Sequence, residues 1–302
     1  MLKGGNQFFA ITGATGWLAR SAIMAIRETY GDTVLPRIKL FSRSASFIEL
    51  QDGLKMQVES YANLENYHYE FYLPLAFSTR EKFFELGQKK YLEVNQDVIS
   101  QDLRIITSNP EMRVILISSG VVNGLSESQS INPSYRAYAK LKLQQELLYR
   151  EAANNDSLLT ICRLYSCSSS DLIKIEGYAI ASFVAYAMLN KPIHITSSAP
   201  VFRNYVDLRQ LFVALLQNNE CGLVNTSGPK IEIKDLAKMV IEQLDSSSTL
   251  TFSRSAKGAL GNIYLSPDNS MFELFSKLNL GVLTLEDQII NTSKGVKRLL
   301  TL

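Results

Sequence analysis

Short apolar runs alternate with helical patterns along the first half of the chain. The apolar runs have the length and composition of buried strands, and they predict strands at residues 8–11, 38–41, 71–75, 113–117 and 159–164. Between them, apolar side chains recur at helical spacing and predict helices at residues 19–28, 91–106 and 138–153. Strands that alternate with helices form parallel sheets through right-handed crossovers. The pattern therefore predicts an α/β fold built on a doubly wound parallel sheet.

The alternation loosens after residue 165. The later part carries further helical patterns and one short strand, at residues 177–189, 192–195, 235–244 and, twice, within 269–302. No internal repeat or low-complexity linker separates the two halves. We therefore expect residues 1–165 to form the sheet domain, which also receives about residues 200–228. Residues 166–302 are expected to form a smaller, interleaved C-terminal region.

The composition is that of a globular protein without a strong charge bias. Hydrophobic residues make up 46% of the 302 positions, and 31 basic against 29 acidic residues give a net charge of +2. This balance predicts no binding to nucleic acid, and the lack of an apolar run of about 18 residues predicts no membrane span. The first residues are too few and too polar for a signal peptide, and the three cysteines form no CxxC. A cytoplasmic protein with reduced thiols is therefore expected.

The sequence gives little support for a metal site or for a hydrolase with a catalytic triad. His68 and His194 lie far apart, and no spacing of histidine, cysteine and carboxylate residues is typical of a metal site. The GxSxG motif of many serine hydrolases does not occur.

A glycine-rich loop joins the first predicted strand to the first predicted helix, with the sequence Thr12-Gly-Ala-Thr-Gly-Trp-Leu-Ala19. Gly13 can make a tight turn, and Gly16 lets a pyrophosphate approach the backbone. The start of the helix supplies free N–H groups and a positive dipole to such an anion. We therefore favour dinucleotide binding over an ordinary strand–turn–helix connection, with contacts from Gly13, Thr15, Gly16, Trp17 and Leu18.

The end of the second strand indicates which dinucleotide is bound. NAD sites usually carry a carboxylate there to hold the ribose hydroxyls, but this chain has Phe41-Ser-Arg-Ser44, with no carboxylate before Glu49. Arg43 and the two serine hydroxyls could hold a 2′-phosphate. NADP is therefore expected as the cofactor. NAD is the alternative, in which case Arg43 is a solvated surface side chain.

A proton-transfer site is predicted where the 113–117 strand ends. Ser118 and Ser119 follow that strand, at the edge where open parallel sheets bind ligands. Tyr138 and Lys142 are four residues apart on one helix face, so the lysine could lower the pKa of the phenol, whereas Tyr135 lacks this spacing. Such a phenol could exchange a proton with a substrate oxygen during hydride transfer. The alternative for a tyrosine–lysine pair is a surface contact.

These motifs resemble the extended short-chain dehydrogenase/reductase family, the nucleotide-sugar epimerases, dehydratases and reductases, along nearly the whole chain. The loop from Thr12 resembles TGxxGxxG, the stretch from Ser119 to Gly124 resembles SxxVYG, and Tyr138 to Lys142 with Glu146 is similar to YGxSKxxxE. The resemblance implies a doubly wound Rossmann sheet that binds NAD(P), with a smaller, interleaved C-terminal substrate domain.

The resemblance also implies roles for single residues. It makes Ser119, Tyr138, Lys142 and Asn95 catalytic, with Tyr138 and Lys142 also contacting the cofactor. Leu75 and Ala76 resemble a turn that touches the cofactor, and Arg203 resembles an arginine that contacts the substrate diphosphate. The helices at 91–106 and 138–153 resemble those of a homodimer interface.

Departures from the family pattern narrow the expected reaction. Pro74 replaces a histidine, Asn123 a tyrosine, and Ser168-Ser-Ser170 the usual YGP. Gly120 and Val121 stand where 4,6-dehydratases carry Asp-Glu, and Gly120 stands where keto-sugar 3,5-epimerase/reductases carry cysteine. The remaining expectation is a reductase or epimerase acting on C4 of a nucleotide-diphosphate sugar, for instance in polysaccharide biosynthesis. The alternatives are a non-catalytic NADP sensor and a reductase of a non-sugar carbonyl compound.

Overall fold

The computed structural model describes residues 8–126, 132–153, 158–197, 199–253 and 261–301. The chain divides into two compact units. The first unit comprises Met1–Leu164 and Leu215–Val224, and the second comprises Tyr165–Ala214 and Asn225–Leu302. The segment that returns to the first unit is thus shorter than the expected stretch of about 200–228.

The first unit contains an eight-stranded sheet with the order β11-β7-β6-β5-β1-β2-β4-β3. The strands are β1 (Phe9–Thr12), β2 (Ile38–Ser42), β3 (Ser46–Glu49), β4 (Lys55–Ser60), β5 (Phe71–Pro74), β6 (Arg113–Ser119), β7 (Leu159–Leu164) and β11 (Gly222–Asn225). The pairings from β7 through β6, β5, β1 and β2 to β4 are parallel, and β3 is paired antiparallel to β4. The expected doubly wound α/β sheet is confirmed. Its order reverses at β1, which lies between β2 and β5, and ligands bind at such switch points.

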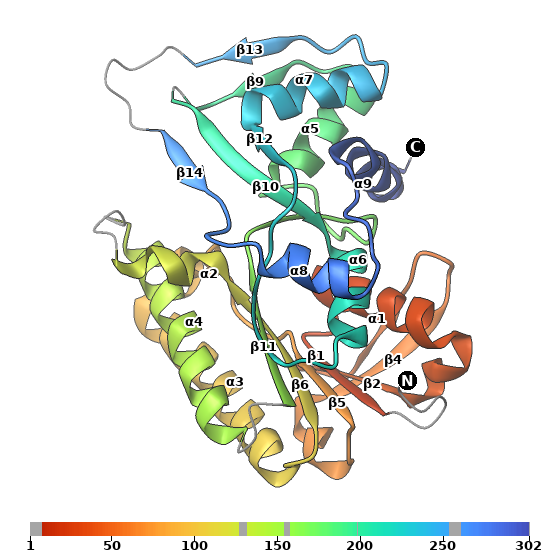
Figure 1. The fold of residues 1–302 in the computed structure, drawn as a ribbon, viewed down its shortest axis with the longest axis vertical. Helices are drawn as coiled ribbons and strands as arrows, with labels where there is room; N and C mark the ends of the chain where they lie inside the picture. The colour runs from red at the N-terminus through yellow and green to blue at the C-terminus, as the bar shows by residue number, and fades with distance from the viewer. Residues whose placement is uncertain (1–7, 127–131, 154–157, 198, 254–260, 302) are drawn as a thin grey trace. The chain divides into compact units, whose positions relative to one another are not determined.

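Helices cover both faces of this sheet (Figure 1). Helix α1 lies on one face, and α3 and α4 lie side by side on the other. The helical segments of this unit are α1 (Trp17–Tyr30), η1 (Asp32–Arg37), η2 (Tyr61–Asn66), α2 (Lys82–Leu86), α3 (Gln88–Ser108), η3 (Gly120–Ser126) and α4 (Pro133–Ala152). Helix α4 begins five residues before the expected start, because Asn132 caps its first turn and Pro133 fits its first position.

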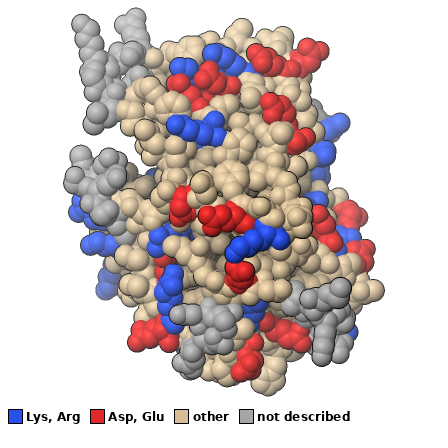
Figure 2. Space-filling view, in the orientation of Figure 1, with Lys and Arg blue, Asp and Glu red and all other residues tan. Residues whose placement is uncertain are grey.

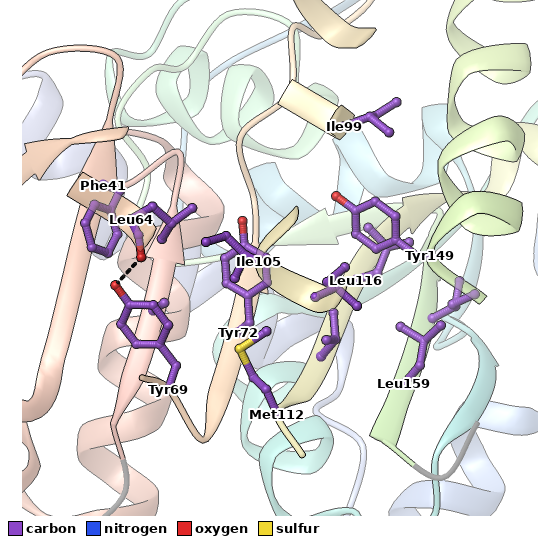
Figure 3. Close-up of a cluster of buried hydrophobic side chains, with 14 residues drawn as sticks. Phe41, Leu64, Tyr69, Tyr72, Ile99, Ile105, Met112, Leu116, Tyr149 and Leu159 are labelled. Carbon is purple, nitrogen blue, oxygen red and sulfur yellow. Dashed lines mark hydrogen bonds between the residues drawn. The ribbon is translucent and has the colours of Figure 1, made fainter. Parts of the chain in front are cut away.

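A buried cluster joins the sheet to α3 and α4 (Figure 3). The rings of Tyr72 and Tyr149 lie among Ile105, Leu116 and other apolar side chains of these elements. Burial of this much apolar surface fixes α3 and α4 against the strands that end at the predicted site.

The second unit has its own small sheets and helices. Strand β10 (Val201–Asp207) pairs with β12 (Lys230–Glu232), β14 (Asn262–Tyr264) and β8 (Ser166–Ser168), and β13 (Leu250–Phe252) pairs with β9 (Ile193–Ile195). Its helices are α5 (Ala179–Met188), α7 (Ile233–Gln243), α8 (Ser270–Lys277) and α9 (Leu285–Leu299), and α6 (Leu208–Gln217) runs across a unit boundary. Helices α7 and α9 both pack on α5.

The surface carries charges of both signs, as the near-neutral composition predicts. On the face drawn in Figure 2, basic and acidic side chains are interspersed, and neither sign forms a continuous area of its own. Within the described ranges, every helix is too short or too polar to cross a bilayer.

Candidate functional site

The loop after β1 has a geometry that requires glycine at its first turn. Gly13 has a φ of 65°, and a Cβ at this position would lie 2.7 Å from Ala76 N and 2.7 Å from Leu75 O. Gly16 N donates to Gly13 O at 2.9 Å and closes the turn. The predicted contact segment at Leu75 and Ala76 is therefore packed directly beneath the glycine loop.

Helix α1 presents an N-terminus suited to an anion. Gly16 is its N-cap, no side chain caps this end, and no acidic residue stands in its first turn. Trp17 and Leu18 form the start of that turn. A helix of this length carries a partial positive charge at such an end, and no carboxylate of its own offsets it.

A large cavity opens at this loop. Its volume is about 1280 Å³, above the roughly 300–1,000 Å³ of ordinary small-molecule sites. Among the predicted cofactor contacts, Gly13, Thr15, Arg43 and Ala76 line it. Four serines of the β2, β3 and β4 region also line it, namely Ser42, Ser44, Ser46 and Ser60. A glycine cradle, an uncapped helix and hydroxyl groups around one cavity fit a phosphate-bearing dinucleotide.

Arg43 lies at the β2 side of this cavity, where its guanidinium could contact a bound anion. Its side chain is exposed, and within the described part of the chain no carboxylate lies within ion-pair distance of it. Ser42 next to it donates to Ser44 O at 2.6 Å, which holds the turn that carries Arg43. This position suits a phosphate on the ribose, as the sequence predicts.

Ser119 and Tyr138 come together. Ser119 is the last residue of β6, and its hydroxyl lies close enough to the Tyr138 phenol to lower the pKa of that phenol. Burial raises the pKa of Tyr138, and the Ser119 hydroxyl and the charge of Arg80 only partly oppose that rise. The sequence predicts a lowered pKa for this phenol. In this geometry the phenol instead stays protonated at neutral pH.

Lys142 points into the protein interior. It is 5% exposed, and its Nζ donates to Ile117 O at 3.1 Å and to Gln145 Oε1 at 3.0 Å. Burial lowers the pKa of Lys142 to about 7, while the carboxylates of Glu146 and Asp102 act to raise it. The pairing of Lys142 with Tyr138 that the spacing predicts is therefore indirect.

Phe77 connects the cavity to these side chains. Its ring lines the cavity, lies 5.8 Å from the Tyr138 ring in an edge-on contact, and has Lys142 Nζ 3.9 Å from its centroid. The glycine loop and the proton-transfer residues thus meet through one aromatic side chain. The sequence pattern did not single out Phe77, since an apolar residue after a strand is usually a packing residue.

Asn95 holds the segment that carries Phe77. Its Oδ1 accepts from Ser78 N at 2.8 Å, and its Nδ2 donates to Ser78 O and to Tyr91 O. The resemblance assigns Asn95 to the support of Lys142. Its direct hydrogen bonds hold Ser78 in the cavity wall, and its support of Lys142 stays a prediction.

A buried ion pair stands behind Ser119. Glu146 of α4 accepts from Arg163 of β7 through both carboxylate oxygens, the shortest contact being 2.6 Å, and also from Ser118 Oγ at 2.5 Å. Arg163 Nη1 donates to Asn123 Oδ1 at 2.5 Å. Asn123, which stands where the resembled family has a tyrosine, thus connects η3 to β7 through this hydrogen bond.

Arg203 lies on β10 of the second unit. Its Nη1 donates to Phe202 O at 2.7 Å and to Asn262 O at 3.2 Å, and its guanidinium lies over the Tyr264 ring. Its contact with a substrate diphosphate stays a prediction.

Asp102 is a buried carboxylate that the sequence pattern did not single out. It is fully buried on α3 and accepts hydrogen bonds from Tyr61, Tyr72 and Tyr149. A signal for it existed, because Asp102 falls on the buried stripe of α3, three residues from both Ile99 and Ile105. As for metals, the described residues contain no cluster of three or more ligand-type side chains.

Comparisons with known proteins identify the fold. No family model and no curated protein matches the chain in sequence. Among solved structures, the epimerase Mth375 from Methanothermobacter thermautotrophicus is similar with a TM-score of 0.74 and 14% identity, covering 98% of this chain and 94% of that one. The UDP-N-acetylglucosamine 4-epimerase from Methanobrevibacter ruminantium, solved with UDP-N-acetylmuramic acid, has a TM-score of 0.73 and 15% identity over 98% and 99% of the two chains.

A third similar structure is the UDP-glucose 4-epimerase of Thermus thermophilus in complex with NAD. It has a TM-score of 0.69 and 15% identity, covering 96% of this chain and 98% of that one. The fold expected from the sequence resemblance is therefore confirmed: this chain has the fold of NAD-binding nucleotide-sugar epimerases.

Proposed function

We propose that this chain is an NAD(P)-dependent oxidoreductase of the extended short-chain dehydrogenase type that reduces or epimerises C4 of a nucleotide-diphosphate sugar. The observation that carries the proposal is the edge-on contact of the Tyr138 ring, 5.8 Å from Phe77, with the cavity wall, and Ser119 lies close enough to act on the same phenol. Two of the similar structures hold a UDP-sugar or NAD, which supports this ligand class.

In this proposal, one group of residues binds the cofactor and another acts on the substrate. Gly13, Thr15 and the start of α1 hold the pyrophosphate, and Arg43 holds a 2′-phosphate. The bound nicotinamide supplies the hydride. Ser119 orients the substrate oxygen, and the Tyr138 phenol exchanges a proton with it.

Two features favour reduction. The raised pKa of Tyr138 keeps its phenol protonated, which suits donation to a carbonyl oxygen. An unpaired Arg43 favours NADP, the exchangeable cofactor of net reduction. Dehydration is disfavoured, because Gly120 and Val121 carry no group that could move a proton.

One observation favours a second candidate, a non-catalytic NADP-binding sensor. Lys142 directs its ammonium to Ile117 O and Gln145, and not to the cavity. A sensor needs only the cavity and Arg43, whereas an enzyme also needs Tyr138. Turnover therefore separates the two candidates.

The test measures NADPH oxidation with a panel of nucleotide-diphosphate 4-keto sugars. We expect Tyr138→Phe to lose about 100-fold or more in kcat with an unchanged Kd for NADPH, because it removes only the proton donor. Tyr135→Phe, on the same helix, is the matched control and keeps its activity. Full activity in Tyr138→Phe would overturn the assignment, and cofactor binding without turnover on any carbonyl substrate would favour the sensor.

The cofactor choice is tested by binding alone. Arg43→Ala should weaken NADPH binding about 10-fold to 100-fold, since a charge-assisted phosphate contact contributes roughly 1.5–3 kcal/mol, and should leave NADH binding unchanged. Arg150→Ala, an exposed arginine at the end of α4, is the control. Equal losses for NADPH and NADH would contradict the 2′-phosphate role.

A further inference from the structure

Asp102 is a buried carboxylate held by three phenols from three different elements. Tyr61 of η2 donates to its Oδ1 at 2.5 Å, Tyr72 of β5 donates to the same oxygen, and Tyr149 of α4 donates to Oδ2. The side chain is 0% exposed. The three bonds use three of the roughly four lone-pair sites of the carboxylate, two on Oδ1 and one on Oδ2.

The surroundings of this cluster are apolar, as Figure 3 shows for Tyr72 and Tyr149. Ile99 and Ile105 flank Asp102 on its own helix, and Leu116 of β6 belongs to the same buried cluster as Tyr72 and Tyr149. In such surroundings charges interact over longer distances than at the surface, and an uncompensated charge is strongly unfavourable.

The buried charges of the region can be matched in pairs. Glu146 is taken by Arg163 in a two-pronged ion pair. Lys142 remains without a carboxylate in direct contact, since its ammonium donates to Ile117 O and Gln145 Oε1. Two carboxylates raise the pKa of Lys142: Glu146, which has the larger effect but is shared with Arg163, and Asp102, which has no cation in direct contact among the described residues.

A chain of hydrogen bonds links these two charges. Lys142 Nζ donates to Gln145 Oε1, Gln145 Nε2 donates to the Tyr149 hydroxyl at 3.2 Å, and Tyr149 donates to Asp102. Each donor points toward the carboxylate, so the dipoles of Gln145 and Tyr149 are aligned with the field between ammonium and carboxylate. An aligned chain of this kind strengthens each of its bonds.

We propose that Asp102 is the counter-ion of Lys142, a positioning residue that keeps the buried ammonium charged and fixed behind Tyr138. Its effect on turnover rests on the proposed function, but its effect on the ionisation of Lys142 does not.

The charges and ionisable groups around the lysine agree with this role. Burial raises the pKa of Asp102 to about 6, and the three phenols and Lys142 oppose that rise, so the carboxylate is ionised at neutral pH. The groups that face this region from the packed elements are Tyr61, Tyr72, Tyr149, Glu146 and Arg163. Burial and the Asp102 charge raise the pKa of all three phenols far above their usual value, so they remain neutral.

The direct test follows the ionisation of Lys142 itself. In protein labelled with ¹³C at the lysine ε-carbon, the resonance that disappears in Lys142→Arg is titrated by NMR. We expect its midpoint to fall by about one pH unit or more in Asp102→Asn, because a nearby opposite charge favours the charged form by that amount. Glu93→Gln, which removes a carboxylate from the partly exposed side of the same helix, should leave the midpoint unchanged.

A midpoint that stays within about 0.3 unit in folded Asp102→Asn would overturn the proposal. If that variant does not fold, Tyr149→Phe tests the proposal in its place, because it removes the hydroxyl that links Gln145 to Asp102 and so removes one hydrogen-bond donor to Asp102. It should move the midpoint of Lys142 downward as well, by a smaller amount, and an unchanged midpoint there would equally overturn the proposal.

Turnover gives the second readout. If the chain has the proposed activity, the alkaline limb of kcat/KM against pH should shift to lower pH in Asp102→Asn, because Lys142 then loses its proton earlier. If the wild-type chain shows no turnover, the proposed function fails, while the NMR titration still decides the pairing of Asp102 with Lys142.

Discussion

Gly13 is the backbone position on which the cavity floor depends. Its φ of 65° suits glycine, and any Cβ would press on Ala76 N and Leu75 O at 2.7 Å. We predict that Gly13→Ala lowers stability by about 1–3 kcal/mol through strain, and weakens NADPH binding because the loop must move away from Ala76. Urea unfolding and fluorescence titration of NADPH measure the two effects.

Gly281→Ala is the matched control for this prediction. Gly281 has no atom within 4 Å of a Cβ and no positive φ, so the same change should be nearly neutral there. Equal behaviour of the two variants would show that the loop does not need glycine at position 13.

Sequence reasoning predicted that Ser119 and Tyr138 lie near each other, but it did not predict the directions of the neighbouring side chains. The four-residue spacing places Tyr138 and Lys142 on one side of α4, and Ser119 meets Tyr138 as β6 ends. The spacing cannot show that Lys142 turns inward, because that depends on Ile117 O and Gln145 as acceptors. Asp102 was missed because a lone carboxylate in a polar helix usually faces water.

At the scale of elements, the hydrogen bonds around the Glu146–Arg163 ion pair connect four elements of the first unit. Glu146 on α4 binds Ser118 on β6 and Arg163 on β7, and Arg163 binds Asn123 in η3. We predict that Glu146→Gln destabilises the protein by about 3–5 kcal/mol, because it leaves the buried Arg163 charge without its partner. Urea unfolding measures this difference.

The control is an ion pair of the same charge type at the surface. Glu85 on α2 pairs with Lys82 at 2.6 Å, and both side chains are more than half exposed. Glu85→Gln should change stability by no more than about 0.5 kcal/mol, since exposed pairs contribute little. A comparable loss in both variants would contradict a special role for the buried pair.

The strands and helices of the first half were predicted well because each one carries its own periodicity. Strand β7 has the expected bounds, and β2 and β6 extend the expected runs by one and two residues. The pattern missed β3, β4 and β10, because the apolar residues of each are few and interrupted by polar ones. The return to the first unit was expected for about residues 200–228, but the narrower bounds of Leu215–Val224 depend on tertiary contacts that the local pattern does not show.

At the scale of the whole molecule, the buried charges couple stability to pH. The pKa of Asp102 is raised from 3.8 to about 6, so between these values the folded state holds a proton that the unfolded state has released. Stability from this group is fully present below about pH 4 and is lost as pH rises through about 6. The shift corresponds to a loss of up to about 3 kcal/mol.

We therefore predict that wild-type protein loses stability relative to Asp102→Asn as pH rises from about 4 to about 6.5, because the variant has no carboxylate to ionise there. Trp17 is the single tryptophan and lies in α1, so its fluorescence during urea unfolding reports the unit that contains Asp102. In the wild type Lys142 stays mostly protonated over this range, below its lowered pKa of about 7, and an earlier loss of its proton in Asp102→Asn would change the difference in the same direction at the upper end of the range. Parallel stability curves for the two proteins over this range would mean that Asp102 ionises in the folded state as easily as in water.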